Sequence, residues 1–167
     1  TLDRSSAASD VYKRQENNAV TAGIVKQIRA DKIYPADESI ILYAGWPQLK
    51  DYNGKTHTSD LTIVSDNYGV KLLKIYVSSD KAEAKKEALS ILQSAATTES
   101  LLGKSLKLKR RRKLVFDVVP ILYAPNLGGA ELEIDDVELA LNENDLRRIL
   151  LDDGGQISPD QKGEIQA

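Results

Sequence analysis

The 167-residue chain has no cysteine and no methionine, and it has one histidine, one tryptophan and one phenylalanine. Without cysteine there are no disulfides and no thiolate metal sites. The single histidine, His57, excludes a metal site built from several histidines and disfavours a Ser-His-Asp triad; we expect it to be exposed in a polar loop. No run of about 18 apolar residues is present, so the sequence predicts no membrane-spanning helix. These absences favour a cytoplasmic protein.

The two ends of the chain carry different signals. Residues 1–15 lack apolar periodicity and resemble translated sequencing adaptor, with Ser5 to Gln15 matching its fixed part, so we set them aside as not natural. Ser158, Pro159 and Gln161 have the spacing of a capping box with proline at the first helical position, and no stop signal follows this helix start. We therefore expect the chain to be a piece of a larger protein.

Apolar periodicity predicts the element order α-β-β-β-α-β. The expected helices cover 17–30 and 80–98, with a further helical piece around 99–106, and the expected strands cover 39–44, 60–65, 70–77 and 114–123. Residues 46–55 read as a loop, and Pro120 marks a bulge, an edge or the limit of its strand. The fold class is α/β, a sandwich with a mixed sheet in which a helix crosses over between the third and fourth strands.

Composition divides the natural part into three segments. An α/β domain covers 16–125, an acidic connecting segment covers 126–155, and residues 156–167 begin a further domain. The connecting segment carries a short strand at 137–141 and a helix that Asn142 or Asn144 could cap. Without residues 1–15 the chain has 20 basic and 23 acidic residues, a balance that makes no case for nucleic acid by itself.

The element order, together with Asp60 at the opening of the second core strand, resembles the PD-(D/E)XK nuclease superfamily. More narrowly, residues 16–123 resemble the nuclease-related domain at the N-terminus of some superfamily I DNA helicases. The resemblance implies a restriction-endonuclease-like α/β/α sandwich. In active members a Glu-x-Lys lies near the end of the third strand, where two carboxylates hold Mg²⁺ and the lysine positions or activates the attacking water.

The chain departs from that catalytic pattern. Lys74 stands at the glutamate position and would repel Mg²⁺, and Tyr76 stands at the lysine position and cannot replace an ammonium group. Glu16 adjoins the adaptor boundary. We therefore expect no metal site and no cofactor here, and an accessory helicase domain that assists DNA engagement without cleavage; ATP and Mg²⁺ would act in a downstream part. The alternatives are a nucleic-acid or protein-binding module, and a divergent Mg²⁺-dependent nuclease that recruits Asp66 or Glu83.

Charge is distributed unevenly along the chain. Seven cations and no acids lie between residues 104 and 113, whereas nine acids and two arginines lie between 131 and 153. The basic run is either a solvated turn, paired with the acidic stretch, or a contact for a phosphate backbone, with DNA as the expected partner. The candidate nucleic-acid contacts are Lys107, Lys109, Arg110, Arg111, Arg112 and Lys113.

Three further features have weaker functional readings. Gly103-Lys104-Ser105 is a fragment of a phosphate-binding loop, but residue 98 is threonine where the first glycine of such a loop belongs, and the fragment follows a helix instead of a strand. Trp46 and Tyr52 could stack on bases or pack against the sheet.

Overall fold

The computed structural model describes residues 18–45, 48–50, 56–111, 113–127, 134 and 136–166. A helix over 18–29 precedes the first strand. The elements that follow are β1 (Ile40–Ala44), β2 (Gln48–Lys50), β3 (Thr56–Thr58), β4 (Leu61–Ser65), β5 (Gly69–Ile75), α2 (Lys81–Leu102), the 3₁₀ turn η1 (Leu106–Leu108), β6 (Lys109–Arg110), β7 (Lys113–Leu114), β8 (Val118–Tyr123), β9 (Glu138–Ala140), α3 (Glu143–Leu150) and α4 (Pro159–Gln166).

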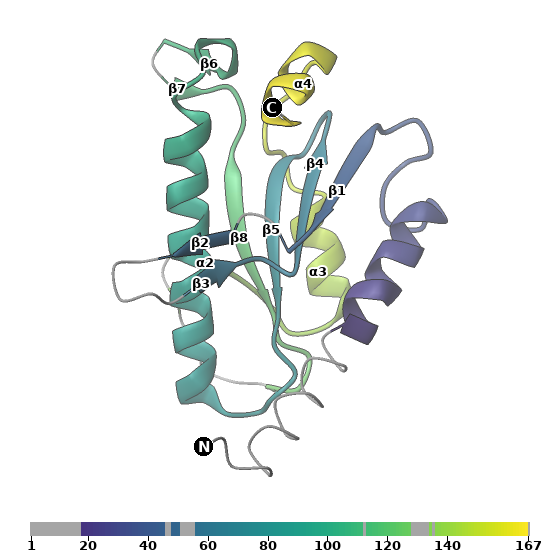
Figure 1. The fold of residues 1–167 in the computed structure, drawn as a ribbon. Helices are drawn as coiled ribbons and strands as arrows, with labels where there is room; N and C mark the ends of the chain where they lie inside the picture. The colour runs from purple at the N-terminus through teal and green to yellow at the C-terminus, as the bar shows by residue number, and fades with distance from the viewer. Residues whose placement is uncertain are drawn as a thin grey trace.

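Five strands form a mixed sheet in the order β1-β4-β5-β8-β9 (Figure 1). β1, β4 and β5 are antiparallel neighbours, and β5 pairs with β8 in parallel through the α2 crossover. β9 then joins β8, also in parallel. Two short antiparallel pairs, β2-β3 and β6-β7, lie outside this sheet. The expected mixed α/β sheet is therefore confirmed.

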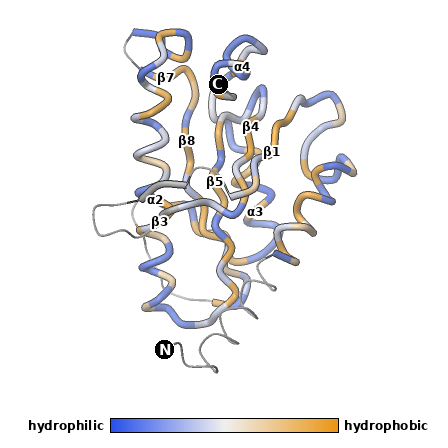
Figure 2. The backbone as a smooth tube through the Cα atoms, in the orientation of Figure 1, coloured by the Kyte–Doolittle hydropathy of each residue, from blue (hydrophilic) through white to orange (hydrophobic). Residues whose placement is uncertain are grey.

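Helices cover both faces of the sheet. Consecutive side chains of β5 point to opposite faces of the sheet. Leu72 packs in the apolar layer that contains Ile91 of α2. Leu73 packs on the other face, in the layer that contains Ile24 and Ile149. The helix over 18–29 and α3 cover this second face (Figure 1). Figure 2 shows apolar residues concentrated along β5 and β8, between the helices. No helix in the described part of the chain is both long and apolar enough to cross a membrane.

Three predicted boundaries were wrong. α2 runs unbroken to Leu102 instead of splitting near residue 98, and the predicted loop at 46–55 contains β2, which pairs with β3. The strand expected at 114–123 is interrupted, since β7 ends at 114 and β8 begins at 118. Pro120 lies inside β8, one residue before the first pairing of β8 with β9, and no described residue pairs with β8 on that side at this position. The missing N–H therefore costs no ladder hydrogen bond with the described residues.

Residues 136–166 pack as part of the same body. β9 extends the sheet, Leu146 and Ile149 of α3 lie in one apolar layer, and Ile157 and Ile165 lie in the other. Residues on both sides of positions 125 and 155 thus contribute to the same two apolar layers. The predicted helix starts are confirmed. Asn142 caps α3 by accepting from the Asp145 N–H at 2.8 Å, and Ser158 and Gln161 form the reciprocal capping box of α4.

Candidate functional site

The basic run folds into the β6-β7 hairpin. Leu108 and Phe116 are buried in the core at its base, and the Val115 N–H donates to the Leu108 carbonyl at 3.0 Å. Exposure then increases along the hairpin. Lys109 and Leu114 are half-buried, and the next pair, Arg110 opposite Lys113, is exposed. Because its base is anchored and its end is solvated, the hairpin forms a ridge that carries positive charge away from the core.

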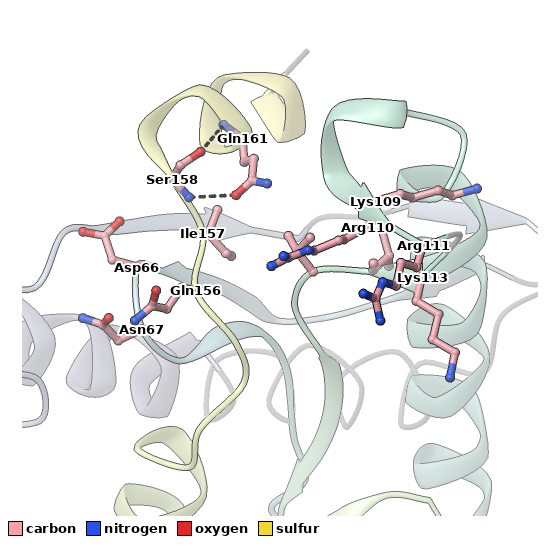
Figure 3. A pocket seen from close by; sticks show the side chains of 12 residues that line it. Asp66, Asn67, Lys109, Arg110, Arg111, Lys113, Gln156, Ile157, Ser158 and Gln161 are labelled. Atoms are coloured by element: carbon pink, nitrogen blue, oxygen red, sulfur yellow. Dashed lines mark hydrogen bonds between the residues drawn. The ribbon is translucent and has the colours of Figure 1, made fainter.

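This ridge forms one side of an open hollow of about 1090 Å³. Figure 3 shows the Arg110 side chain reaching from the hairpin into the hollow, with Asp66, Asn67 and Gln156 on the far side. Four of the six predicted contacts line it: Lys109, Arg110, Arg111 and Lys113. Arg112 lies outside the described residues. The structure thus brings most of the basic run to one site.

The far side of the hollow comes from two distant parts of the sequence, the β4-β5 turn and residues 156–161. The Ile157 N–H donates to the Asp66 carbonyl at 2.8 Å, and the Asp117 N–H donates to the Gly154 carbonyl at 2.7 Å. Residue 154 also lies close to the backbone of Tyr68 in the β4-β5 turn. Glycine is needed at this position, because a Cβ on Gly154 would lie 2.2 Å from the Tyr68 carbonyl oxygen. The segment before α4 is therefore fixed between the β4-β5 turn and the base of the hairpin.

Among the described residues, Asp66 is the carboxylate that lines the hollow, and it already has a cationic partner. Lys162 of α4 is 6% exposed; its ammonium group pairs with the Asp66 carboxylate and donates to the Ser39 carbonyl at 2.8 Å. The charge of Asp66 is therefore largely offset, and the hairpin cations dominate the field in the hollow.

The hairpin cations in the hollow differ from Lys107 in their partners. Lys109, Arg110, Arg111 and Lys113 form no ion pair with any other residue that the structure describes. Lys107 lies toward α4 instead, where its ammonium group is 3.9 Å from Glu164 and its carbonyl accepts from the Gln161 side chain at 3.1 Å. Of the described cations of the basic run, the first four are thus gathered at the hollow without an ion-pair partner in the described part of the chain.

A second, smaller hollow of about 520 Å³ lies between the hairpin and the C-terminal part of α2. Lys109 and Lys113 line it together with Glu99 and Asp117. Burial, reinforced by the charge of Asp117, raises the pKa of the Glu99 carboxyl above its ordinary value. Two cations here face two acids, so this hollow lacks the positive excess of the first.

Asp60, Lys74 and Tyr76, the residues compared above with a nuclease site, lie at the other end of the sheet. Asp60 precedes β4 and Lys74 and Tyr76 lie at the end of β5, whereas the β4-β5 turn beside the basic hollow lies at the start of β5. The seven residues of β5 span about 20 Å at roughly 3.3 Å per residue. Phosphate contacts in the basic hollow would therefore not deliver a strand directly to Asp60.

Each of the three nuclease-like positions has an internal partner. Asp60 accepts from the Ile75 N–H at 2.7 Å, and the Tyr76 hydroxyl donates to the Asp80 carbonyl at 2.6 Å. The Lys74 ammonium group is 3.8 Å from the Glu87 carboxylate, in a small cavity that Glu83 also lines. These contacts stabilise the end of the sheet against α2.

The described residues do not fit a divalent cation at this place. They contain no cluster of three or more His, Cys, Asp or Glu side chains able to hold a metal ion. Lys74 brings a positive charge where a ligand would be needed. Asp66, considered above as a replacement ligand, lies at the far end of β4 and pairs with Lys162. Glu83 does line the cavity beside Lys74.

The Gly103-Lys104-Ser105 fragment does not line the hollow. Gly103 ends α2 and Ser105 precedes a 3₁₀ turn, so the Gly-Lys-Ser fragment does not connect a strand to a helix. Trp46, Tyr52 and Glu16 lie outside the described residues, as does the side chain of His57. Sequence reasoning missed Lys162 and the 154–157 segment, whose roles depend on contacts across roughly a hundred residues.

No family model, curated protein or solved structure matches this chain.

Proposed function

We propose that this chain is a nucleic-acid-binding module that holds a phosphate backbone in the basic hollow and does not cleave it. The observation that carries this proposal is the set of four hairpin cations lining an open hollow without ion-pair partners among the described residues. Basic side chains that contact phosphates supply most of the sequence-independent affinity for nucleic acid.

The form of the hollow favours a polyanion over a small metabolite. The cations are spread along both strands of a solvent-exposed hairpin instead of converging on one buried point. Small-molecule sites are usually enclosed and largely apolar, with a few precisely placed polar groups. An extended anionic chain can contact several of these side chains at once, whereas a single small anion cannot.

Asp60, Lys74 and Tyr76 support the proposal that the chain does not cleave DNA. A restriction-endonuclease-like fold remains our interpretation of the α-β-β-β-α-β order. Metal-assisted cleavage on that fold would need a second carboxylate beside Asp60 and an ammonium group next to the water. Lys74 puts an ammonium group where the carboxylate is needed, and Tyr76 puts a phenol where the ammonium group is needed, so we propose that this end of the sheet has a structural role.

Salt dependence of binding tests the proposal. If Lys109, Arg110 and Lys113 each contact one phosphate of duplex DNA, log K against log salt should have a slope of about −2.7. Replacing Arg110 and Lys113 by alanine should reduce this to about −0.9. The charge-matched control replaces Lys85 and Lys86, two exposed lysines of α2, and should leave the slope unchanged. Equal slopes in the two double variants, or no salt-dependent binding by the parent, would contradict the proposal.

We propose further that such a module serves an ATP-dependent DNA helicase. The support is the resemblance of residues 16–123 to nuclease-related helicase domains, together with a basic hollow suited to DNA. Sequencing the gene region that follows tests this separately. A strand followed by a glycine-rich loop ending in Gly-Lys-Ser or Gly-Lys-Thr would support the helicase. A continuous reading frame without such a loop would refute the helicase and leave DNA binding in place.

A further inference from the structure

The turn of the basic hairpin has an unfavourable backbone conformation. Arg111 has φ = +53°, in the left-handed region that residues with a Cβ rarely adopt. Residues 111 and 112 connect the facing pair Arg110 and Lys113, and two-residue loops of this kind strongly favour Asn-Gly or Asp-Gly. Here both positions are arginine. A residue kept in a strained conformation against the preference of its turn points to a function for its side chain.

We infer that the tip of the β6-β7 hairpin enters the major groove of double-stranded DNA, where Arg111 meets the base edges while one phosphate strand lies in the hollow beside Arg110. This inference rests on the proposed function and specifies its substrate class.

The dimensions of the hairpin match the major groove. Paired strands lie about 4.8 Å apart, and the three residues that follow Leu108, ending at Arg111, extend at most roughly 10 Å at 3.4 Å each. The major groove of B-form DNA is about 12 Å wide and 8.5 Å deep and admits a two-stranded ribbon, whereas the minor groove is about 6 Å wide. The guanidinium group of an arginine at the tip can bond two acceptors on the edge of guanine, O6 and N7.

The lining of the hollow disfavours the other nucleic acids. Proteins that bind single strands combine a basic groove with aromatic side chains on which the bases stack. No aromatic residue lines this hollow among the described residues. Duplex RNA presents a deep, narrow major groove that side chains cannot read. Duplex DNA is therefore the substrate that fits both the ridge and the hollow.

Charge decides on which side of the ridge the phosphate strand lies. The hollow between the hairpin and α2 holds Glu99 and Asp117 opposite Lys109 and Lys113, so it offers no net attraction. The larger hollow carries the same two lysines plus the two arginines, and Asp66, the acid that the described part of the chain places there, is paired with Lys162. The strand therefore lies on the side toward α4, and the hairpin tip points across the adjacent major groove.

Fluorescence anisotropy with labelled 20-nucleotide probes of one sequence tests this inference. The probes are duplex DNA, single-stranded DNA, duplex RNA, and duplex DNA in which 7-deazaguanine removes guanine N7 from the major groove. The parent should bind duplex DNA more tightly than each of the other three. Arg111→Gly should weaken duplex DNA binding about five- to a hundredfold and should bind the guanine and 7-deazaguanine duplexes equally. The matched control is Asp31→Gly, a second residue of positive φ (+58°), which lies outside the hollow.

The outcomes separate this inference from the function on which it rests. Salt-dependent binding that is equal for all four probes, or that is unchanged by Arg111→Gly, would overturn the groove entry but leave phosphate binding intact. If no probe binds, both ideas fail. Glycine is compatible with φ = +53°, so Arg111→Gly should fold, and its far-UV circular dichroism should match the parent. Arg111→Asn, which also tolerates this conformation, should reproduce the loss and exclude an effect of chain flexibility.

Discussion

Replacing Lys162 by methionine should destabilise this protein much more than removing an exposed lysine. The Lys162 ammonium group lies under α4 and connects it to the β4-β5 turn through Asp66 and to the segment before β1 through the Ser39 carbonyl. Methionine retains the apolar contacts of the lysine stem but supplies no donor and no charge. The variant therefore leaves a carboxylate and a carbonyl without the partner they have in the parent.

The expected loss follows from the burial of the two partners. Removing one member of a fully buried ion pair costs roughly 3–5 kcal/mol. The Asp66 side chain is 33% exposed, so water can solvate part of the charge that is left. Loss of the hydrogen bond to Ser39 adds about 1 kcal/mol. The free energy of unfolding should therefore fall by about 1–3 kcal/mol.

Urea denaturation followed by circular dichroism measures this difference. The matched control is Lys107→Met, which removes a lysine whose side chain is 74% exposed and 3.9 Å from Glu164. That change should cost less than about 1 kcal/mol. In the double variant Lys162→Met/Asp66→Asn, part of the loss should return, because no unpaired carboxylate remains. If Lys162→Met lowers the free energy of unfolding no more than Lys107→Met does, the Lys162-Asp66 pair does not stabilise the fold as proposed.

The Lys162-Asp66 pair should also affect DNA binding, and its effect on binding should not follow its effect on the free energy of unfolding. Lys162→Met leaves the negative charge of Asp66 facing the hollow and should weaken DNA binding by about 0.5–1 kcal/mol at low salt. Asp66→Asn should strengthen binding, although it also lowers stability. Parallel changes in binding and stability across these variants would contradict the proposed electrostatics of the hollow.

Three further predictions concern other parts of the fold. Burial lowers the pKa of Lys71 below its ordinary value of 10.5. As the pH approaches 10.5 from below, the folded chain therefore binds fewer protons than the unfolded chain. The free energy of unfolding should rise with pH over this range. Lys71→Met should abolish this rise in urea titrations at several pH values. Asp60→Ala should lower the free energy of unfolding by about 1–2 kcal/mol in urea denaturation, because the Ile75 N–H loses its acceptor. The same variant tests cleavage. If the parent cleaves DNA with Mg²⁺ or Mn²⁺ and Asp60→Ala does not, the non-cleaving proposal is overturned. Asn142→Ala should lower thermal stability by about 1 kcal/mol through loss of the α3 cap, and an unchanged melting temperature would contradict this.

Local sequence signals located the regular elements well where one periodicity dominated. The apolar strands β4 and β5 and the two capped helix starts were predicted within a few residues. The errors fell where local preference was weak. β2 has three residues and exists as a strand through its pairing with β3, and the C-terminal turns of α2 pack Leu102 into a core that periodicity does not reveal.

The sequence by itself determined that seven cations and no acids lie between residues 104 and 113, and that no Glu-x-Lys occurs in the predicted strand that contains Lys74 and Tyr76. Both conclusions depend only on residue identity and short spacing. Only the tertiary structure decided that the basic hairpin faces the β4-β5 turn, that Lys162 offsets Asp66 there, and that the nuclease-like positions lie at the opposite end of β5. These relations depend on sheet register and on contacts between residues up to 123 positions apart, which no local pattern encodes.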